Sequence, residues 1–174
     1  MDLSNIKFFD IGAGGNPNCH EDPEWIHNDI RPLPHIEVVS SADKLPLQDN
    51  SVKVKLFARY VIEHFPYSKV ADVFTEWIRI MDIGCELEFH TLDIVELNRQ
   101  LEKKYIGIDW YNKMLFGSQN YDENFHQSVY TFEWYKGLLE KMGLKLIQRS
   151  KQNKWENYER TAPYCPIMVI TAVK

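Results

Sequence analysis

The sequence of 174 residues has few cysteines and no long apolar run. Cys19, Cys85 and Cys165 are odd in number and far apart, so they match neither a disulfide framework nor the paired ligands of a zinc site. A reducing, cytoplasmic location fits this usage best. No stretch approaches the roughly 18 apolar residues that cross a bilayer, and no signal peptide is recognisable. We therefore expect no membrane partner.

Positive charge is not in excess either. The net charge of −5 argues against a general affinity for nucleic acid, whose phosphates attract clustered lysine and arginine. The densest basic run, between Lys145 and Arg160, is interrupted by Glu156 and Glu159, and we interpret it as a solvated surface. The length and a hydrophobic content of 44% suit one domain over residues 1–174. No nucleic acid is expected as a partner.

Near the N-terminus, a hydrophobic strand expected over residues 6–11 runs into the glycine-rich turn Gly12-Ala13-Gly14-Gly15. In parallel α/β proteins such a strand ends at the sheet edge where ligands bind, and glycine permits positive φ and a close ligand approach. Pro17 stands where a dinucleotide fingerprint requires a third glycine, which counts against NAD or FAD. Asn16 could instead cap one or two helical turns that begin at Pro17. An ordinary strand with a glycine turn is the alternative.

Hydrophobic periodicity predicts the remaining elements. Strands are expected over 25–30, 36–39, 52–58, 86–92, 144–148 and 167–173, and helices over 68–81, 93–105 and 131–142. The last two strands are expected to be antiparallel neighbours. Residues 106–130 are aromatic but hard to assign to regular structure, and we interpret them as a folded lid or wall, because disordered segments contain few aromatics. A hydrophobic core under a long loop explains the same aromatics equally well.

Three acidic residues are placed where loops leave consecutive strands. Asp10 could accept backbone N–H groups of the glycine turn and fix its shape. Asp29 could accept both hydroxyl protons of a ribose. Asp43 could accept an adenine amino proton beside the backbone groups of Ala42 and Leu45. For Asp29 and Asp43, an acid that only caps a turn is an equally good interpretation.

Four segments resemble successive motifs of the class I S-adenosylmethionine-dependent methyltransferases, in the same order and with similar spacing. They are Asp10-Ile11-Gly12-Ala13-Gly14-Gly15, Asn28-Asp29-Ile30, residues 42–51 and Tyr60-Val61-Ile62-Glu63-His64-Phe65. The chain is similar in particular to small methyltransferases of the methyltransferase-11 type, whose later segment resembles residues 115–143. The likeness covers nearly the whole chain.

The resemblance implies an α/β, Rossmann-like methyltransferase fold, with a mostly parallel seven-stranded sheet, helices on both faces and an antiparallel last strand. It also implies S-adenosylmethionine as the cofactor. Gly12 and Gly14 would pass beneath its methionine part, and Arg59 and Tyr60 would line that side. The full set of expected cofactor-binding residues is Asp10, Gly12, Ala13, Gly14, Asp29, Ala42, Asp43, Leu45, Arg59 and Tyr60.

The chain departs from the family pattern in two places. Residues 81–85 stand where a Lys-Pro-Gly-Gly-like turn is usual, and they lack its proline and one glycine. Only five residues precede Ile6, where family members commonly carry a helical extension that helps to close the site. We therefore expect either residues 106–130 or a second subunit of a homo-oligomer to close the pocket.

Two histidines are the candidate catalytic residues. Methyl transfer from a sulfonium requires alignment and, for some acceptors, a base, and histidine can accept a proton near neutral pH. His64 follows the fourth predicted strand, and His126 lies in the aromatic segment with Gln119. A helix-start histidine satisfied by polar neighbours is the alternative for His64, and His90, within a strand, is interpreted as structural. No metal is expected, because the cysteines and histidines lack ligand spacing.

These patterns predict an S-adenosylmethionine-dependent methyltransferase that acts on a small-molecule or glycan-like acceptor. The alternative is a non-catalytic domain of the same fold that binds S-adenosylmethionine or S-adenosylhomocysteine as a regulatory or assembly protein. A nicotinamide-dependent dehydrogenase is a third and poorer interpretation, because of Pro17 and because no set of hydride-transfer residues is recognisable.

Overall fold

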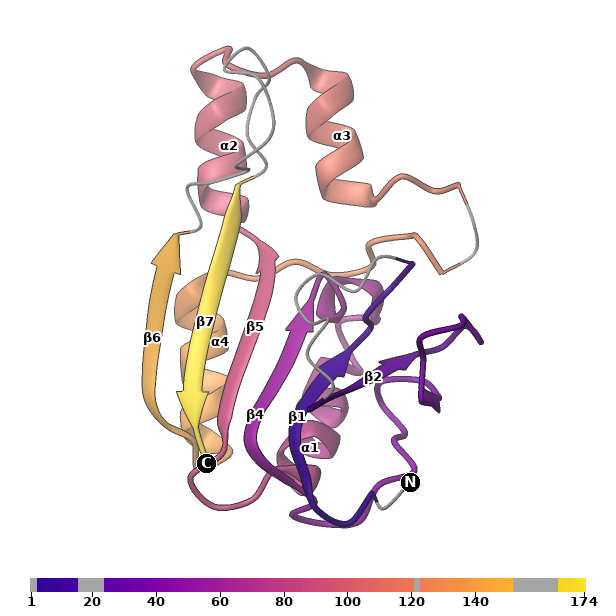
Figure 1. Ribbon diagram of the computed structural model, residues 1–174. Coiled ribbons are helices and arrows are strands. Elements are labelled where there is room, and N and C mark those ends of the chain that lie inside the picture. The colour runs from indigo at the N-terminus through magenta and orange to yellow at the C-terminus, as the bar shows by residue number, and fades with distance from the viewer. Residues whose placement is uncertain (1–2, 16–23, 121–122, 152–165) are drawn as a thin grey trace.

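The computed structural model describes residues 3–15, 24–120, 123–151 and 166–174. Its strands are β1 (Ile6–Ile11), β2 (Trp25–Asp29), β3 (Val38–Val39), β4 (Val52–Arg59), β5 (Glu86–Leu92), β6 (Lys145–Lys151) and β7 (Ile167–Val173). They form one seven-stranded sheet in the order β3-β2-β1-β4-β5-β7-β6 (Figure 1). Strands β1 to β5 pair in parallel, whereas β7 is antiparallel to both β5 and β6. The predicted mostly parallel sheet with an antiparallel last strand is confirmed.

The helices are α1 (Val70–Ile80), α2 (Ile94–Glu102), α3 (Ile108–Phe116), α4 (Phe132–Lys141) and the short 3₁₀ helix η1 (Ile62–His64). Helices α1 and α4 lie against one face of the sheet, and α2 and α3 stand beyond the carboxyl end of β5 (Figure 1). In the described ranges no helix covers the opposite face, so the expected two-sided cover is seen on one side only. One reason is that turns and the two-residue strand β3, not a helix, connect β2 to β4.

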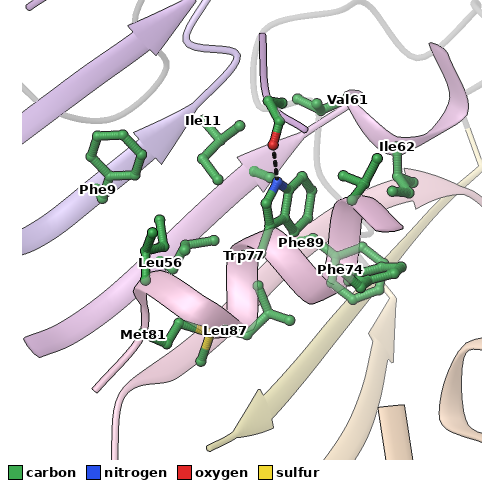
Figure 2. Packing of buried hydrophobic residues seen from close by; sticks show 14 of the residues in the cluster. Phe9, Ile11, Leu56, Val61, Ile62, Phe74, Trp77, Met81, Leu87 and Phe89 are labelled. Atoms are coloured by element: carbon green, nitrogen blue, oxygen red, sulfur yellow. Dashed lines mark hydrogen bonds between the residues drawn. The ribbon is translucent and has the colours of Figure 1, made fainter. Parts of the chain in front are cut away.

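The main core lies between the sheet and α1. Phe74 and Trp77 are fully buried on the inner side of α1 and pack with Leu56 of β4 and Phe89 of β5 (Figure 2). The rings of Phe74 and Phe89 are edge to face at 5.2 Å between centroids, a favourable aromatic geometry. The apolar stripe predicted over 68–81 thus forms the helix that anchors the sheet. The turn before β5 forms without a proline, because Gly84 adopts a φ of +85°.

Residues 106–130 differ most from the sequence prediction, because α3 occupies 108–116. Together with α2, this helix surrounds a second apolar cluster built on Leu92, Leu97 and Ile106. Trp110 packs against that cluster, so some of the aromatic content belongs to a small core. No residue of α3 is fully buried. The helix covers only one side of a small cluster, which explains why its sequence carries no wide apolar stripe.

Two edge strands have boundaries different from those predicted. Strand β3 contains only Val38 and Val39, and β6 spans Lys145–Lys151 rather than 144–148. Each is paired on one side only, and Leu146 of β6 is exposed, so the burial pattern that defines a strand is weak there. The helical turns expected after Asn16 lie outside the described residues.

Candidate functional site

The glycine turn follows β1 at the carboxyl edge of the parallel strands. Gly12 and Gly14 have φ values of +66° and +70°, a region that favours glycine. The buried Ala13 donates its backbone N–H to the carbonyl of Asn28 at 2.9 Å, and Gly14 donates its N–H to Oδ2 of Asp29 at 2.9 Å. The end of β2 therefore holds the turn in shape.

Asp10 lies at the end of β1 and is buried. Its Oδ2 is 3.3 Å from Nδ1 of His27 on β2, which is also buried. In the described part of the chain, the carboxylate that accepts an N–H of the glycine turn is that of Asp29. The turn-fixing role expected of Asp10 is thus performed by Asp29, because the Asp10 side chain is directed to its cross-strand neighbour.

Gly12 approaches Val61 too closely to carry a side chain. A Cβ added to Gly12 would lie 2.4 Å from Cγ2 of Val61. We expect Gly12→Ala to lower the free energy of unfolding by about 2–3 kcal/mol, through the left-handed backbone and the steric overlap. Gly84→Ala is the matched control, because Gly84 also has a positive φ but open space around it, and should cost about 1 kcal/mol. Equal losses in urea unfolding would contradict the close contact with Val61.

Asp29 is a buried carboxylate with several donors around it. Oδ1 accepts hydrogen bonds from the backbone N–H of Arg31 at 2.9 Å and from its Nε at 3.0 Å. Burial alone would raise the pKa of Asp29, but the hydrogen bonds from Arg31 and from the Gly14 N–H outweigh it and lower the pKa below its usual value. Asp29 is therefore ionised at neutral pH.

Two residues beside the turn were missed by the sequence analysis. Arg31 follows Asp29 by two positions. Aspartate side chains often accept a hydrogen bond from the backbone N–H two residues later, so the spacing could have indicated this contact. His35 lies with Nε2 2.8 Å from the carbonyl of Gly14 and gives no such signal, because the contact spans 21 positions. Both side chains place polar groups against the turn.

The loop after β3 is fixed to helix α1. The carbonyl of Ala42 accepts a hydrogen bond from Nε1 of Trp77 at 2.9 Å (Figure 2), and the N–H of Leu45 donates to Oε1 of Glu76 at 2.7 Å. The Asp43 side chain between them is exposed. The Ala42 carbonyl and the Leu45 N–H are thus engaged within the protein, and the exposed Asp43 carboxylate accepts a hydrogen bond from Oγ of Ser41 at 2.5 Å.

The end of β4 carries the two residues expected on the methionine side. Tyr60 adopts a φ of +56°, unusual for a residue with a side chain, and donates its N–H to the carbonyl of His90 at 2.9 Å. The guanidinium carbon of Arg59 lies 5.7 Å from the centre of the Tyr60 ring. The buried Nε of Arg59 has no hydrogen-bond partner within the described residues. Because buried donors are normally paired, this N–H is a candidate ligand contact.

The two predicted catalytic histidines are neighbours. The rings of His64 and His126 are 5.0 Å apart between centroids, and their planes are inclined by 73°. Nδ1 of His64 lies 3.2 Å from the carbonyl of Phe125, and Nδ1 of His126 lies 2.9 Å from that of Met114. Nδ1 is thus the donor in both rings, and in the neutral form Nε2 carries the lone pair. Burial lowers the pKa of both histidines, so they are neutral at pH 7.

A short contact between η1 and the segment after α3 brings these histidines together. Gln127 donates its backbone N–H to the carbonyl of Glu63 and its side-chain amide to the carbonyl of His64, each at 2.7 Å. Gly117 begins the loop that leads there, and a Cβ on it would meet the carbonyl of Asn124 at 2.4 Å. The fold thereby joins two residues that are 62 positions apart.

Glu63, next to His64, is a buried carboxyl group that the sequence analysis did not single out. Its Oε2 is 3.5 Å from Oγ1 of Thr91, and its Oε1 has no hydrogen-bond partner among the residues described. Burial raises the pKa of Glu63 to about 8, so the carboxyl group keeps its proton at neutral pH. Its position directly after the apolar pair Val61-Ile62 was the available signal.

His90 has structural partners. Its Nε2 lies 2.8 Å from Oε1 of Glu88, and its ring meets Phe57 edge to face at 5.1 Å. Hydrogen bonds from His90 and Lys55 lower the pKa of Glu88 to about 2 against the opposing effect of burial. This environment agrees with the structural interpretation of His90.

Within residues 3–15, 24–120, 123–151 and 166–174, no group of three or more His, Cys, Asp or Glu side chains is arranged to hold a metal ion. No helix there combines the length and apolar character needed to span a membrane.

The site residues converge because the strands from β1 to β5 run in parallel and end at one edge. Four features lie at or just after the ends of these strands: the glycine turn, Asp29, the loop of Asp43 and the pair Arg59–Tyr60. His64 follows β4 in η1, and His126 lies beside it. An ionised acid beside a left-handed glycine turn can bind the hydroxyl groups of a ribose. The arrangement can therefore hold a nucleoside-like ligand with neutral imidazoles beside it.

Comparisons with known proteins identify the fold. No protein-family model and no curated protein matches the sequence. Among solved structures, an S-adenosylmethionine-dependent methyltransferase from Archaeoglobus fulgidus matches over 99% of this chain and 87% of its own, with a TM-score of 0.67 and 17% identity. One from Thermotoga maritima matches over 97% and 82%, with a TM-score of 0.65 and 18% identity.

A third match is a methyltransferase from Haloferax volcanii, in a complex with the Trm112 methyltransferase activator, with a TM-score of 0.64 and 11% identity over 99% of this chain and 84% of that one. At these identities the likeness concerns the fold. The chain has the Rossmann-like fold of the class I S-adenosylmethionine-dependent methyltransferases.

Proposed function

We propose that the protein binds S-adenosylmethionine at the carboxyl edge of β1 to β4 and transfers its methyl group to a small-molecule or glycan-like acceptor. One observation carries the proposal: Asp29, an ionised acid at the end of β2, accepts the N–H of Gly14 in a left-handed glycine turn. The same fold occurs in S-adenosylmethionine-dependent methyltransferases over nearly the whole chain.

The residues at this edge fit such a cofactor. Among the described residues, the nearest atoms to a Cβ added at Gly14 would be 4.0 Å away, and the buried Nε of Arg59 has no hydrogen-bond partner. The proposed contacts are the methionine part with Gly12, Ala13, Gly14, Arg59 and Tyr60, the ribose with Asp29, and adenine with Ala42, Asp43 and Leu45. Asp10 would act indirectly, through His27 of the adjacent strand. When bound, S-adenosylmethionine supplies a methyl group on a positively charged sulfur, together with a good leaving group.

His64 and His126 are proposed as the base and the orienting residue for the acceptor. Both rings are neutral at pH 7 and donate from Nδ1 to backbone carbonyls, so Nε2 is the atom able to take a proton from a hydroxyl or amine. Each ring is fixed by its carbonyl, which reduces the reorganisation needed for proton transfer.

The nature of the acceptor and the partners also belongs to this proposal. A small organic acceptor suits the apolar cluster of α2 and α3 beside the histidines, and histamine is the acceptor suggested for the Thermotoga maritima protein. A second subunit is a candidate for closing the site. A cytoplasmic location and the absence of a nucleic-acid partner remain predictions from cysteine usage and charge.

Binding of the cofactor and of its demethylated product tests the nucleoside site. Titration calorimetry should detect both S-adenosylmethionine and S-adenosylhomocysteine, and Asp29→Ala should weaken binding about 10- to 100-fold, as expected when a charged acceptor of hydrogen bonds is removed. Asp72→Ala, an exposed acid on α1, is the control and should bind as the wild type does. No binding by the wild type at millimolar ligand would refute the proposal.

Transfer is tested separately, with labelled S-adenosylmethionine and a panel of small hydroxyl, carboxyl, amine and sugar acceptors. For the acceptor that is methylated, His64→Asn should lower the transfer rate at unchanged cofactor affinity. Cofactor binding by the wild type without transfer to any acceptor would favour the non-catalytic alternative.

A further inference from the structure

The ribose-binding carboxylate of the proposed site is already occupied by a side chain of the protein. Asp29 accepts two backbone hydrogen bonds, from Gly14 to Oδ2 and from Arg31 to Oδ1, both at 2.9 Å. The Arg31 guanidinium adds a second pair of contacts, from Nε to Oδ1 at 3.0 Å and from Nη2 to Oδ2 at 3.4 Å. All four in-plane lone pairs of the carboxylate therefore have donors.

Two of these four donors are backbone N–H groups, of Gly14 and Arg31, and the other two belong to the Arg31 side chain. The backbone bonds fix the position of Asp29 relative to the glycine turn. The guanidinium lies on the remaining positions, and its Nη2 is also the side-chain atom nearest to a Cβ added at Gly14, at 4.0 Å. It thus lies against the carboxylate expected to bind the ribose and beside the turn expected beneath the methionine part.

We propose that Arg31 competes with the ribose hydroxyls for Asp29, so that the nucleoside binds only when the Arg31 guanidinium withdraws from the carboxylate. This inference rests on the proposed function. It assigns to Arg31 a role that opposes cofactor binding, whereas an arginine at a nucleotide site usually assists binding. The backbone bond from Arg31 to Asp29 persists when the side chain leaves, so the carboxylate stays oriented for the incoming hydroxyls.

The exposure of the two partners makes the exchange feasible. The Arg31 side chain is 38% exposed and that of Asp29 is 7% exposed, so the guanidinium can move into water while the carboxylate remains in place. Ion pairs of this half-exposed kind contribute little, typically below about 1 kcal/mol. Removing the competitor should therefore strengthen nucleoside binding by at most roughly fivefold.

The test compares Arg31→Met with the wild type by calorimetry, using S-adenosylhomocysteine because it lacks the sulfonium charge. Arg31→Met should bind this ligand roughly two- to fivefold more tightly at low salt. The difference should shrink at high salt, since salt weakens the ion pair of the wild type. Arg99→Met is the matched control: it removes another half-exposed arginine from an ion pair, with Glu96 on α2, and should leave affinity unchanged.

A ligand without ribose hydroxyls locates the effect. The gain in Arg31→Met should disappear with the 2′,3′-dideoxy analogue of S-adenosylhomocysteine, because that analogue cannot use the freed carboxylate. A gain that persists with the analogue, or equal or weaker binding of S-adenosylhomocysteine by Arg31→Met, would overturn the competition. Arg31→Lys, which retains the charge but loses the two-point contact, should also bind more tightly and guards against a folding defect in the methionine variant.

The outcomes separate this inference from the proposed function. Binding of S-adenosylhomocysteine by the wild type together with an unimproved Arg31→Met refutes the role of Arg31 alone. Absence of binding by every variant refutes the nucleoside site, and the competition with it.

Discussion

Glu63→Gln is expected to remove most of the loss of stability that the wild type suffers between pH 4.5 and 8. The buried carboxyl group has a pKa of about 8 in the folded protein, against an ordinary value of 4.5. Below pH 4.5 it is protonated in both states. Above that pH the unfolded chain releases the proton and the folded chain keeps it, so stability falls by roughly 1.4 kcal/mol per pH unit until about pH 8. At pH 7 the accumulated difference is about 3 kcal/mol.

Urea unfolding at several pH values measures this dependence. The slope of stability against pH carries the test, since an amide that packs imperfectly shifts the curve without changing its slope. Glu102→Gln, which replaces an exposed glutamate at the end of α2, should keep the wild-type slope. Parallel curves for the wild type and Glu63→Gln would show that the Glu63 carboxyl ionises in the folded state like any exposed acid.

Trp77→Ala should destabilise the protein by about 3–5 kcal/mol, comparable with the whole stability of a small domain. The indole is fully buried, meets Phe74 edge to face at 5.3 Å and donates Nε1–H to the Ala42 carbonyl at 2.9 Å (Figure 2). Its removal creates a cavity under the sheet and leaves a carbonyl without its donor. Thermal or chemical unfolding measures the loss.

Two further substitutions serve as comparisons for Trp77→Ala. Trp77→Phe keeps most of the apolar contact but loses the donor, and should cost about 1–3 kcal/mol while weakening nucleoside binding through the loop of Ala42. Trp134→Ala, on the partly exposed side of α4, should cost under about 1.5 kcal/mol, mainly its stacking on Tyr130. A loss at Trp134 as large as that at Trp77 would contradict the central place of α1 in the core.

Most of the fold could be predicted because the relevant signals are local. The apolar run before the glycine turn and the stripe ending near Met81 depend on the period of one strand or helix, and these elements form as expected. Helix α3 could not be predicted, because none of its residues is fully buried and its apolar pattern is therefore weak. It packs on a cluster that includes Leu97 of α2 and Ile106. Tertiary context decides such a helix.

The site was predictable to the extent that parallel strands bring their carboxyl ends together. That rule suffices for Gly12, Asp29 and Asp43. The same rule does not predict which side chains contact the Asp29 carboxylate, and so the contact with the Arg31 guanidinium was missed. The proximity of His64 and His126 was likewise beyond the sequence, because it depends on the two hydrogen bonds that Gln127 makes to η1.

Those bonds from Gln127 also join two parts of the molecule that are stabilised by different hydrophobic clusters. The nucleoside end depends on β1 to β4 and α1, whose side chains interlock in one core, so a change there is felt throughout. His126 lies instead in the segment after β5, which packs around its own small cluster and is joined to η1 by the hydrogen bonds of Gln127. We therefore expect a substitution in the small cluster to displace His126 relative to His64 while the core between α1 and the sheet stays intact.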